Sequence, residues 1–279
     1  MSFAISLNLL RHGKYNGAML STKLKKRVVP VVQYAHGQVV KSINFNRFRT
    51  IGNLEMTVGL YNKRLIDELV LLDIGLANER GSIKSSVLRW LSENSMMPIT
   101  YGGGIRRLKD IEVCLNNGCD RVIINQAAVH SPELLQRACE CFGGQAIVAG
   151  VDYCSHPAGE RQLYAYWEPN LEQRRLIDHY KTIVDMGVSE ILLTDVTRDG
   201  SMSGMDIDLF ENLGSFERVP TIINGGAGSP EDFTKAFNAG AVAVCASSIF
   251  LFSEFSYGDV KAYAGDFNPQ WISKQKPII

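Results

Sequence analysis

Two glycine-rich segments of this chain have the composition of anion-binding turns. Gly102–Gly104 and Gly225–Gly228 each follow a short β-branched run and precede a helical pattern. Glycine lets backbone N–H groups approach an anion at the positive end of the following helix. A tight turn without a ligand explains either segment alone, but two such segments in matching positions favour phosphate binding. The polar segments that follow the next predicted strands would complete each binding site. The first predicted cradle consists of Gly103, Gly104 and Asn125, and the second consists of Gly225, Gly226, Ala246 and Ser247.

Polar side chains end several otherwise apolar runs and are the candidates for proton transfer. These strand-end residues are Gln33, Asp73, Asp152, Thr194 and Asp195. A carboxylate at the end of an apolar strand is well placed to move a proton. We therefore expect Asp152 to be catalytic; the alternative is a carboxylate that fixes a neighbouring loop.

The segment that follows Thr194 is polar, punctuated by glycine and long enough to reach over such a site. It supplies a second candidate carboxylate, Asp199, and Gly200 is a further candidate phosphate ligand together with Thr194. Lys41 could close over a phosphate. A single lysine in a polar segment is, however, more often a solvated charge.

Short β-branched runs alternate with amphipathic stretches along most of the chain, which is typical of repeated βα units. Eight strands and eight helices in alternation predict a single (β/α)₈ TIM barrel. The expected strands are Arg27–Gln33, Glu68–Ile74, Pro98–Tyr101, Arg121–Asn125, Ala146–Asp152, Glu190–Asp195, Val219–Asn224 and Val242–Ala246. The expected helices are Leu54–Ile66, Ile83–Asn94, Leu108–Asn117, Pro132–Cys141, Leu171–Met186, Asp206–Leu213, Pro230–Ala239 and Tyr257–Tyr263.

An internal repeat divides this barrel into two homologous halves. The run Glu68–Ile74 recurs as Glu190–Val196 at an offset of 122 residues, and the first glycine turn recurs at an offset of 123. The pair Asn117-Gly118 recurs as Ala239-Gly240. Three landmarks in nearly one register indicate duplication rather than chance similarity. We expect the barrel at 25–264, an N-terminal extension at 1–24 and a tail at 265–279.

Four charged residues open strands at the opposite end of the predicted barrel. Arg27, Glu68, Arg121 and Glu190 alternate in sign and would form a ring around the N-terminal mouth. This end of a TIM barrel ordinarily serves stability, so a structural salt-bridge cluster is the simplest interpretation.

Charge and composition limit the partners of this 279-residue chain. Lys plus Arg equals Asp plus Glu at 29 each, so no overall field attracts nucleic acid or an anionic membrane. We find no run long enough to span a bilayer and no secretory signal, and we expect a cytoplasmic protein. No metal or organic cofactor is implied.

In this order, the motifs resemble those of the cyclase subunit of imidazole glycerol phosphate synthase, the HisF family. The segments that carry the resemblance are Arg27–Pro30, Gly37–Phe45, Asp67–Ile74, Gly102–Arg106, Ile124–Val129, Thr194, Arg198–Gly200 and Gly225–Gly228. The resemblance runs from about Lys26 to Tyr263. It implies two phosphate sites and a HisH-like glutaminase at the N-terminal mouth, forming a heterodimer. In the family, ammonia from that partner passes through the barrel; the charged ring matches the family's gate, and Asp120 matches a carboxylate at the partner interface.

Two departures from the family pattern concern the reaction itself. The family uses catalytic aspartates at the ends of strands one and five; Asp152 matches one, but Gln33 occupies the position of the other. An amide cannot exchange a proton near pH 7 as a carboxylate can. The loop after strand five also differs, because it reads Tyr164–Asn170 where the family has a glycine-rich substrate motif.

The resemblance and the departures together favour a specialised paralogue. Such a subunit resembles those that deliver ammonia for acetamidino-sugar formation in surface-polysaccharide biosynthesis, with a separate amidotransferase and a phosphorylated or nucleotide-sugar substrate. One alternative is the cyclase reaction of histidine biosynthesis. Another is a non-catalytic subunit that only activates the glutaminase. A sugar-phosphate isomerase on the same duplicated barrel is disfavoured, because it needs no ammonia gate and also requires an aspartate at position 33.

Overall fold

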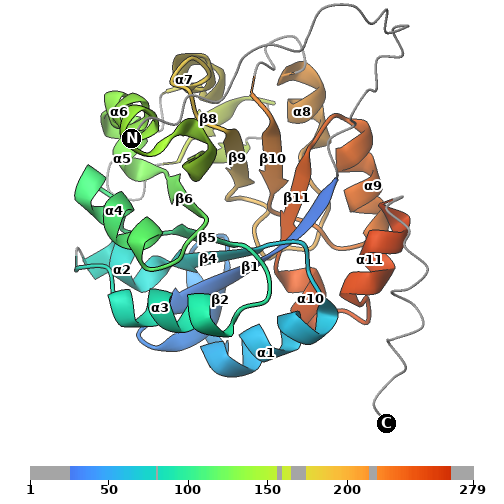
Figure 1. Ribbon diagram of the computed structural model, residues 1–279. Coiled ribbons are helices and arrows are strands. Elements are labelled where there is room, and N and C mark those ends of the chain that lie inside the picture. Colours follow the sequence, from blue (N-terminus) through green and yellow to red (C-terminus); the bar gives the residue numbers. More distant parts are fainter. Residues whose placement is uncertain (1–25, 80, 156–158, 165–173, 214–218, 265–279) are drawn as a thin grey trace, which may run out of the picture.

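Eight parallel strands close into a barrel at the centre of the molecule (Figure 1). The computed structural model describes residues 26–79, 81–155, 159–164, 174–213 and 219–264. The last strand pairs back with the first, which confirms the predicted (β/α)₈ barrel. In barrel order the strands are β1 (Arg27–Ala35), β4 (Leu69–Asp73), β5 (Ile99–Gly102), β6 (Arg121–Ile124), β7 (Ile147–Ser155), β9 (Glu190–Asp195), β10 (Thr221–Asn224) and β11 (Ala243–Ala246). The predicted extension at 1–24 and the predicted tail at 265–279 lie outside the described residues.

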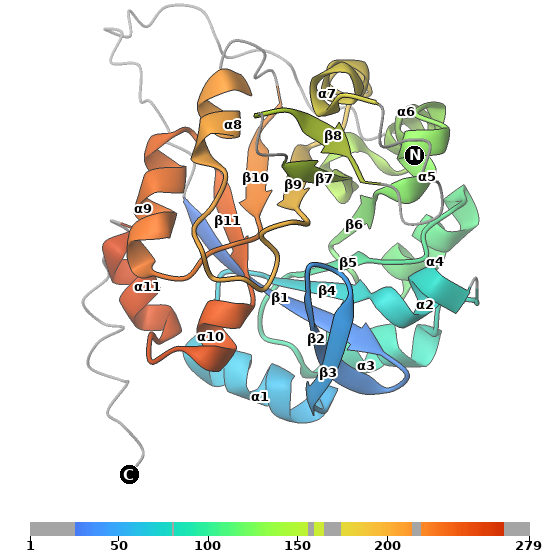
Figure 2. The same cartoon turned by 180° about the vertical axis from the view of Figure 1, so that it is seen from behind.

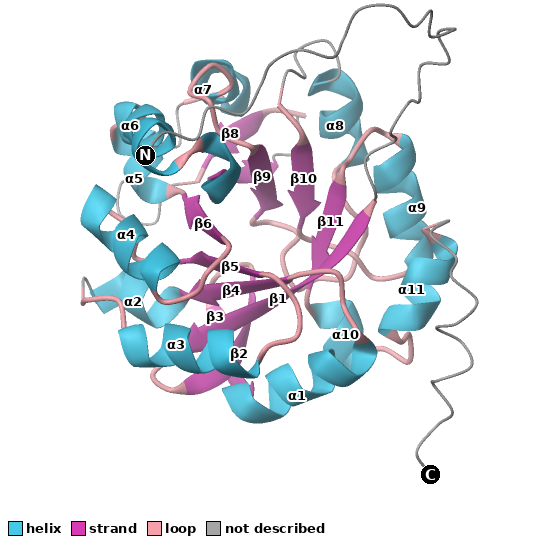
Figure 3. Ribbon diagram, in the orientation of Figure 1, coloured by secondary structure: helices cyan, strands magenta, loops and turns pink. Residues whose placement is uncertain are grey.

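Helices surround the strands as an outer layer (Figure 3). The long ones are α1 (Leu54–Arg64), α3 (Ser85–Asn94), α4 (Leu108–Asn116), α6 (Glu133–Phe142), α7 (Leu176–Ile183), α8 (Ile207–Leu213), α9 (Pro230–Asn238) and α11 (Tyr257–Tyr263). Each overlaps a predicted helix, although the helix expected from Leu171 begins in residues that the structure does not describe. The sequence pattern did not predict the short elements α2 (Ile74–Glu79), α5 (Gln126–His130), α10 (Ser248–Phe252) and the 3₁₀ turn Gly144–Ala146. Five or six residues are too few to display a helical period.

Two antiparallel additions extend the barrel sheet on the side where the strands end. The hairpin of β2 (Gln38–Ile43) and β3 (Arg47–Gly52) pairs with β1, and β8 (Arg161–Leu163) pairs with β7; the hairpin is prominent in Figure 2. At the hairpin tip Asn44 and Phe45 both have positive φ, at 51° and 56°. Such paired left-handed residues form the turn that suits a hairpin, and Gly or Asn usually fills them. Phenylalanine in the second position hid this turn from sequence analysis.

Alternate residues of the strands pack on opposite sides of the barrel wall. One large cluster fills the space between strands and helices and includes Val28, Leu69, Ile99 and Ile191. A second cluster fills the lumen, and its buried members are Val29, Val31, Val70, Ile123, Val148, Leu192, Ile222, Ala243 and Cys245. The lumen is therefore apolar between the two ends of the barrel. Among the described residues, no helix combines the length and the apolar character that a bilayer span requires.

The two halves of the barrel repeat one backbone contact. A Cβ atom on Gly103 would lie 2.2 Å from the carbonyl oxygen of Asp73, and one on Gly225 would lie 2.6 Å from that of Asp195. Both glycines have φ near 100°, a region in which larger residues are strained. Gly103 is therefore the equivalent of Gly225, so the offset at the glycine turns is 122 residues, not 123.

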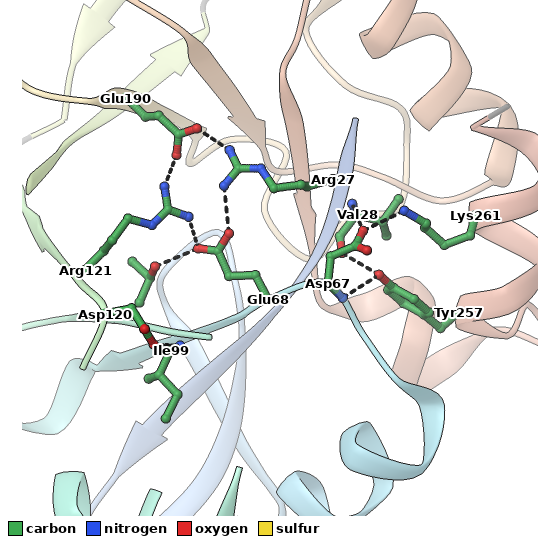
Figure 4. Close-up of polar contacts among 11 residues, drawn as sticks. Arg27, Val28, Asp67, Glu68, Ile99, Asp120, Arg121, Glu190, Tyr257 and Lys261 are labelled. Atoms are coloured by element: carbon green, nitrogen blue, oxygen red, sulfur yellow. Dashed lines mark hydrogen bonds and ion pairs between the residues drawn. The ribbon is translucent and has the colours of Figure 1, made fainter. Parts of the chain in front are cut away.

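The first strand and the last helix are tied together at the N-terminal end. Tyr257 donates its hydroxyl to the Val28 carbonyl oxygen at 2.9 Å and accepts from the Asp67 backbone N–H at 3.0 Å. Lys261 Nζ forms a 2.6 Å ion pair with Asp67, whose carboxylate also accepts from the Val28 N–H (Figure 4). These contacts join the start of β1 to the segment before β4 and to α11, and they stabilise the closed barrel.

Candidate active site

A cavity of about 500 Å³ lies at the C-terminal ends of the strands. The predicted site residues that line it are Gln33, Lys41, Gly103, Gly104, Asn125, Asp152, Thr194, Asp199 and Ser247. Gly200, Gly225, Gly226 and Ala246 instead line a small adjoining niche, which shares Asp199 and Ser247 with the cavity. The structure thus brings the predicted catalytic and phosphate residues to one end of the barrel.

Asp152 lies in β7 and faces the cavity. Thr194 stands opposite it on the neighbouring β9, and Asn125 lines the same cavity. Desolvation by burial raises the pKa of Asp152 from 3.8 to about 7; the charge of Asp199 adds to this effect, and the polar side chains of Asn125 and Thr194 oppose it. A carboxyl group that titrates near neutrality can both accept and donate a proton at physiological pH.

Gln33 lies in β1, two residues before the strand ends at Ala35, and is hydrogen-bonded to the hairpin. Its side-chain oxygen accepts from the Ser42 backbone N–H at 2.8 Å and from the Ser42 hydroxyl at 3.0 Å. The carbonyl side of the amide therefore faces β2. Ser42 carried no signal in the sequence, although it is completely buried and connects Gln33 to Asp199.

Lys41 is not a solvated charge. It lies on β2, its residue is 3% exposed, and its Nζ lies 3.1 Å from both carboxylate oxygens of Asp199. The backbone carbonyl of Asp199 also accepts from the Asn44 N–H at 2.9 Å. Asp199 therefore fastens the hairpin to the loop after β9, and its carboxylate is held by a cation. Asp152 is the cavity carboxyl with the stronger signature of a proton carrier.

The two predicted phosphate cradles differ in openness. The first opens directly into the cavity, where Arg106 and Gln126 lie beside Gly103 and Gly104. At the second, the loop after β9 folds over the glycines, and the Gly204 N–H donates to the Gly226 carbonyl at 2.8 Å. Both remain predicted phosphate sites, of which the first is the more accessible.

Aromatic residues from the β2–β3 hairpin and from the segment after β8 complete the cavity wall. Phe45 and Tyr164 pack edge to face with ring centroids 5.8 Å apart, and Phe48 of β3 also lines the cavity. No role for Phe45 and Phe48 was predictable from the sequence pattern, because that pattern did not indicate the hairpin that carries them. Of the divergent loop 164–170, residues 165–170 lie outside the described part of the chain.

At the opposite mouth the structure joins the four predicted ring residues in a closed cycle (Figure 4). Arg27 pairs with Glu68 at 2.8 Å and with Glu190, and Arg121 pairs with both glutamates as well. The paired carboxylates raise the pKa of the Arg121 guanidinium against the effect of burial. The ring closes the N-terminal end of the apolar lumen.

Two further residues, Thr100 and Asp120, lie next to members of this ring in space or in sequence. The Thr100 hydroxyl donates to Glu68 at 2.6 Å, a contact that sequence analysis did not anticipate. Asp120, the predicted partner-interface residue, is exposed beside Arg121, and its carboxylate accepts from the Ile99 N–H at 2.8 Å.

Comparison with known proteins identifies the family of this duplicated barrel. The sequence profile of the family described as "Histidine biosynthesis protein" matches residues 27–256. The chain is 38% identical over 238 residues to the Campylobacter jejuni protein named "Putative imidazole glycerol phosphate synthase subunit hisF2", covering 85% of this chain and 94% of the relative. It is 35% identical over 241 residues to the HisF subunit of imidazole glycerol phosphate synthase from Lactiplantibacillus plantarum, covering 86% and 96%. It is 34% identical over 246 residues to the HisF subunit from Wolinella succinogenes, covering 86% and 95%.

These similarities cover nearly the whole barrel. The chain belongs to the histidine biosynthesis protein family and, within it, to the HisF-type subunits of imidazole glycerol phosphate synthase.

Proposed function

We propose that this chain is a HisF-like subunit of a glutamine amidotransferase system, which accepts ammonia from a HisH-like glutaminase and conducts it through the barrel. The observation that carries the proposal is the sequence of layers along the barrel: a charged ring, an apolar lumen and an open cavity. Neutral ammonia crosses an apolar layer far more easily than ammonium, because a bare charge is costly to bury. The ring would then serve as the gate, with Asp120 at the partner interface.

The nitrogen acceptor that we propose belongs to acetamidino-sugar biosynthesis, with a separate amidotransferase acting on a nucleotide sugar. Gln33 supports this choice, because its side-chain oxygen is occupied by Ser42 and an amide cannot replace a catalytic carboxylate. The name of the C. jejuni relative, hisF2, is compatible with a second HisF-type subunit. In this role the barrel chiefly delivers ammonia and activates the glutaminase.

A second candidate is the cyclase reaction of histidine biosynthesis, which the pKa of Asp152 and the pairing of Lys41 with Asp199 favour. The substrate would be the phosphoribulosyl formimino aminoimidazole carboxamide ribotide, and the products imidazole glycerol phosphate and the aminoimidazole carboxamide ribotide. Asp152 would be the acid/base group and Asp199 its assistant.

Two measurements separate these roles. Glutamine hydrolysis by the HisH-type glutaminase of the same organism should rise when the purified chain is added; an unchanged rate would contradict the proposal. Steady-state turnover of the ribotide with free ammonium should be far below that of a cyclase with two catalytic aspartates. Turnover equal to that of such a cyclase would establish the histidine-pathway reaction instead.

A subunit that only activates the glutaminase makes a different prediction. Blocking the ring by Glu190→Trp would leave product formation by the assembled complex unchanged if no ammonia passed through it. In a conduit, the same substitution uncouples glutamine hydrolysis from nitrogen transfer.

A further inference from the structure

The two glutamates of the ring are related by the internal repeat, yet they are held differently. Glu68 accepts three hydrogen bonds: from Arg27, from Arg121 and, at 2.6 Å, from the Thr100 hydroxyl. Glu190 accepts one from each arginine, and no other described residue donates to its carboxylate. Glu68 is therefore held by one more hydrogen bond than Glu190.

Strand register explains the difference. Thr100 pairs with Val70, two residues beyond Glu68 on the same face of its strand. In the second half, Ile222 pairs with Leu192, two residues beyond Glu190. Ile222 thus takes the place of Thr100 and belongs to the apolar lumen cluster. Val148, opposite Glu190 on β7, is apolar as well.

The exposed fractions of the two glutamate side chains differ in the same direction as their hydrogen bonding. The Glu68 side chain is 5% exposed and that of Glu190 is 13% exposed. If Glu190 turns toward the water at the mouth, Arg27 and Arg121 both keep Glu68 as a counter-charge. If Glu68 left, one more hydrogen bond would be lost from a more buried site. Of the two glutamates, Glu190 is therefore the less costly one to move.

We propose that Thr100 is a positioning residue that fixes Glu68, and that the ring opens by movement of Glu190 alone. This inference rests on the proposed role of the ring as an ammonia gate, and it names the moving part. The opening lies between the two arginines on the β9 side, and both arginines keep their ion pair with Glu68 while it is open. The gate can therefore open without leaving either arginine without a carboxylate partner.

The test exchanges the hydroxyl between the two halves. In the free full-length chain with ¹³C-labelled glutamate side chains, carboxylate relaxation dispersion should detect microsecond to millisecond exchange at Glu190 and none at Glu68. Ile222→Thr should suppress the exchange at Glu190. Ile222→Val introduces a side chain with the shape of threonine but no hydroxyl, and it should leave the exchange at Glu190 unchanged. The double variant Thr100→Val with Ile222→Thr should transfer the exchange to Glu68.

Equal exchange at both glutamates, its absence at Glu190, or equal effects of the Thr and Val substitutions at position 222 would overturn the inference. Thermal melts show whether a variant has merely lost stability. If Ile222→Thr has done so, its exchange is compared with that of Ile222→Val. The carboxylate measurement needs no partner. If a glutaminase fails to respond to this chain, the proposed function fails while the result on Glu190 still stands.

Discussion

At the N-terminal mouth, four charged side chains neutralise one another in a closed cycle, whereas the cavity at the other mouth holds a carboxyl group, Asp152, with no cation hydrogen-bonded to it among the described residues. Both places are partly or wholly shielded from water. Burial with counter-charges keeps groups ionised, and burial without them moves a pKa toward neutrality. In this barrel, the apolar lumen thus separates the paired charges of the ring from the carboxyl group of Asp152, which can carry a proton.

The largest effect is expected from breaking the cycle. Arg27→Met leaves Glu68 and Glu190 with half of their ion pairs, and removal of one partner from a shielded ion pair costs about 3 to 5 kcal/mol. Urea unfolding measures the loss. The control is Arg175→Met, because Arg175 forms an exposed pair with Asp178 that is worth at most about 1 kcal/mol. Equal losses in both variants would mean that the ring is an ordinary surface cluster.

The second-largest effect is expected in the pH dependence of the free energy of unfolding, to which Asp152 in the cavity contributes. The folded protein holds the Asp152 proton more tightly than the unfolded chain, so the stability from this group is complete below pH 3.8 and is lost as pH rises through about 7. Asp152→Asn should therefore be more stable than wild type at pH 8, by up to about 4 kcal/mol from three pKa units. The advantage should vanish near pH 4. Urea unfolding at several pH values measures the difference.

Asp206 provides the opposite control. Its pKa is lowered, although burial opposes the shift, because Arg161 hydrogen-bonds to it and attracts its charge. Its contribution is present above the ordinary pKa of aspartate and disappears as pH falls. Asp206→Asn should lose stability at neutral pH and approach wild type in acid. The same pH trend in the Asp152 and Asp206 variants would contradict the distinction between paired and unpaired burial.

A smaller effect is expected where Gln33 holds the hairpin. Gln33→Ala leaves the buried Ser42 N–H without its acceptor, at a cost of about 1 to 3 kcal/mol. Amide hydrogen exchange should accelerate at Ser42 but not in the lumen strands. Slow exchange at Ser42 in the variant would show that the hairpin depends on the contact between Lys41 and Asp199 instead.

The smallest effect on stability is expected at Asp120. Asparagine can still accept from the Ile99 N–H, so Asp120→Asn should change stability by no more than about 0.5 kcal/mol. Association with the glutaminase should weaken and lose part of its salt dependence, because a charge at the edge of an interface acts chiefly on the rate of encounter. Titration calorimetry at two salt concentrations measures this. Unchanged affinity would remove Asp120 from the proposed interface.

The barrel was predictable from the sequence because its strands are continuous apolar runs and its halves repeat. The ring was predictable for a related reason: each charged residue stands at the start of such a run, where alternation directs it into the lumen. Gln33 and Asp152 followed from their places at strand ends, and Asp199 from the polar, glycine-punctuated segment after β9. These inferences needed only the strand boundaries and the composition of one loop.

Contacts between distant segments were not predictable. Ser42 and Thr100 matter because the fold places them beside Gln33 and Glu68, and nothing in their own neighbourhood indicates this. The burial of Lys41 depends on a hairpin whose turn contains Phe45 in a conformation that phenylalanine rarely adopts. The difference between the two cradles likewise depends on how the loop after β9 folds back over one of them.

The tie between Tyr257 and Val28 has a consequence for synthesis of the chain on the ribosome. These residues are 229 positions apart, and at about 5 to 20 residues per second the gap takes roughly 10 to 45 s to translate. During that interval β1 lacks β11 as a neighbour, and the growing sheet presents open edges that can pair with other nascent chains. The first strand therefore stays open to such pairing until β11 and α11 have been synthesised.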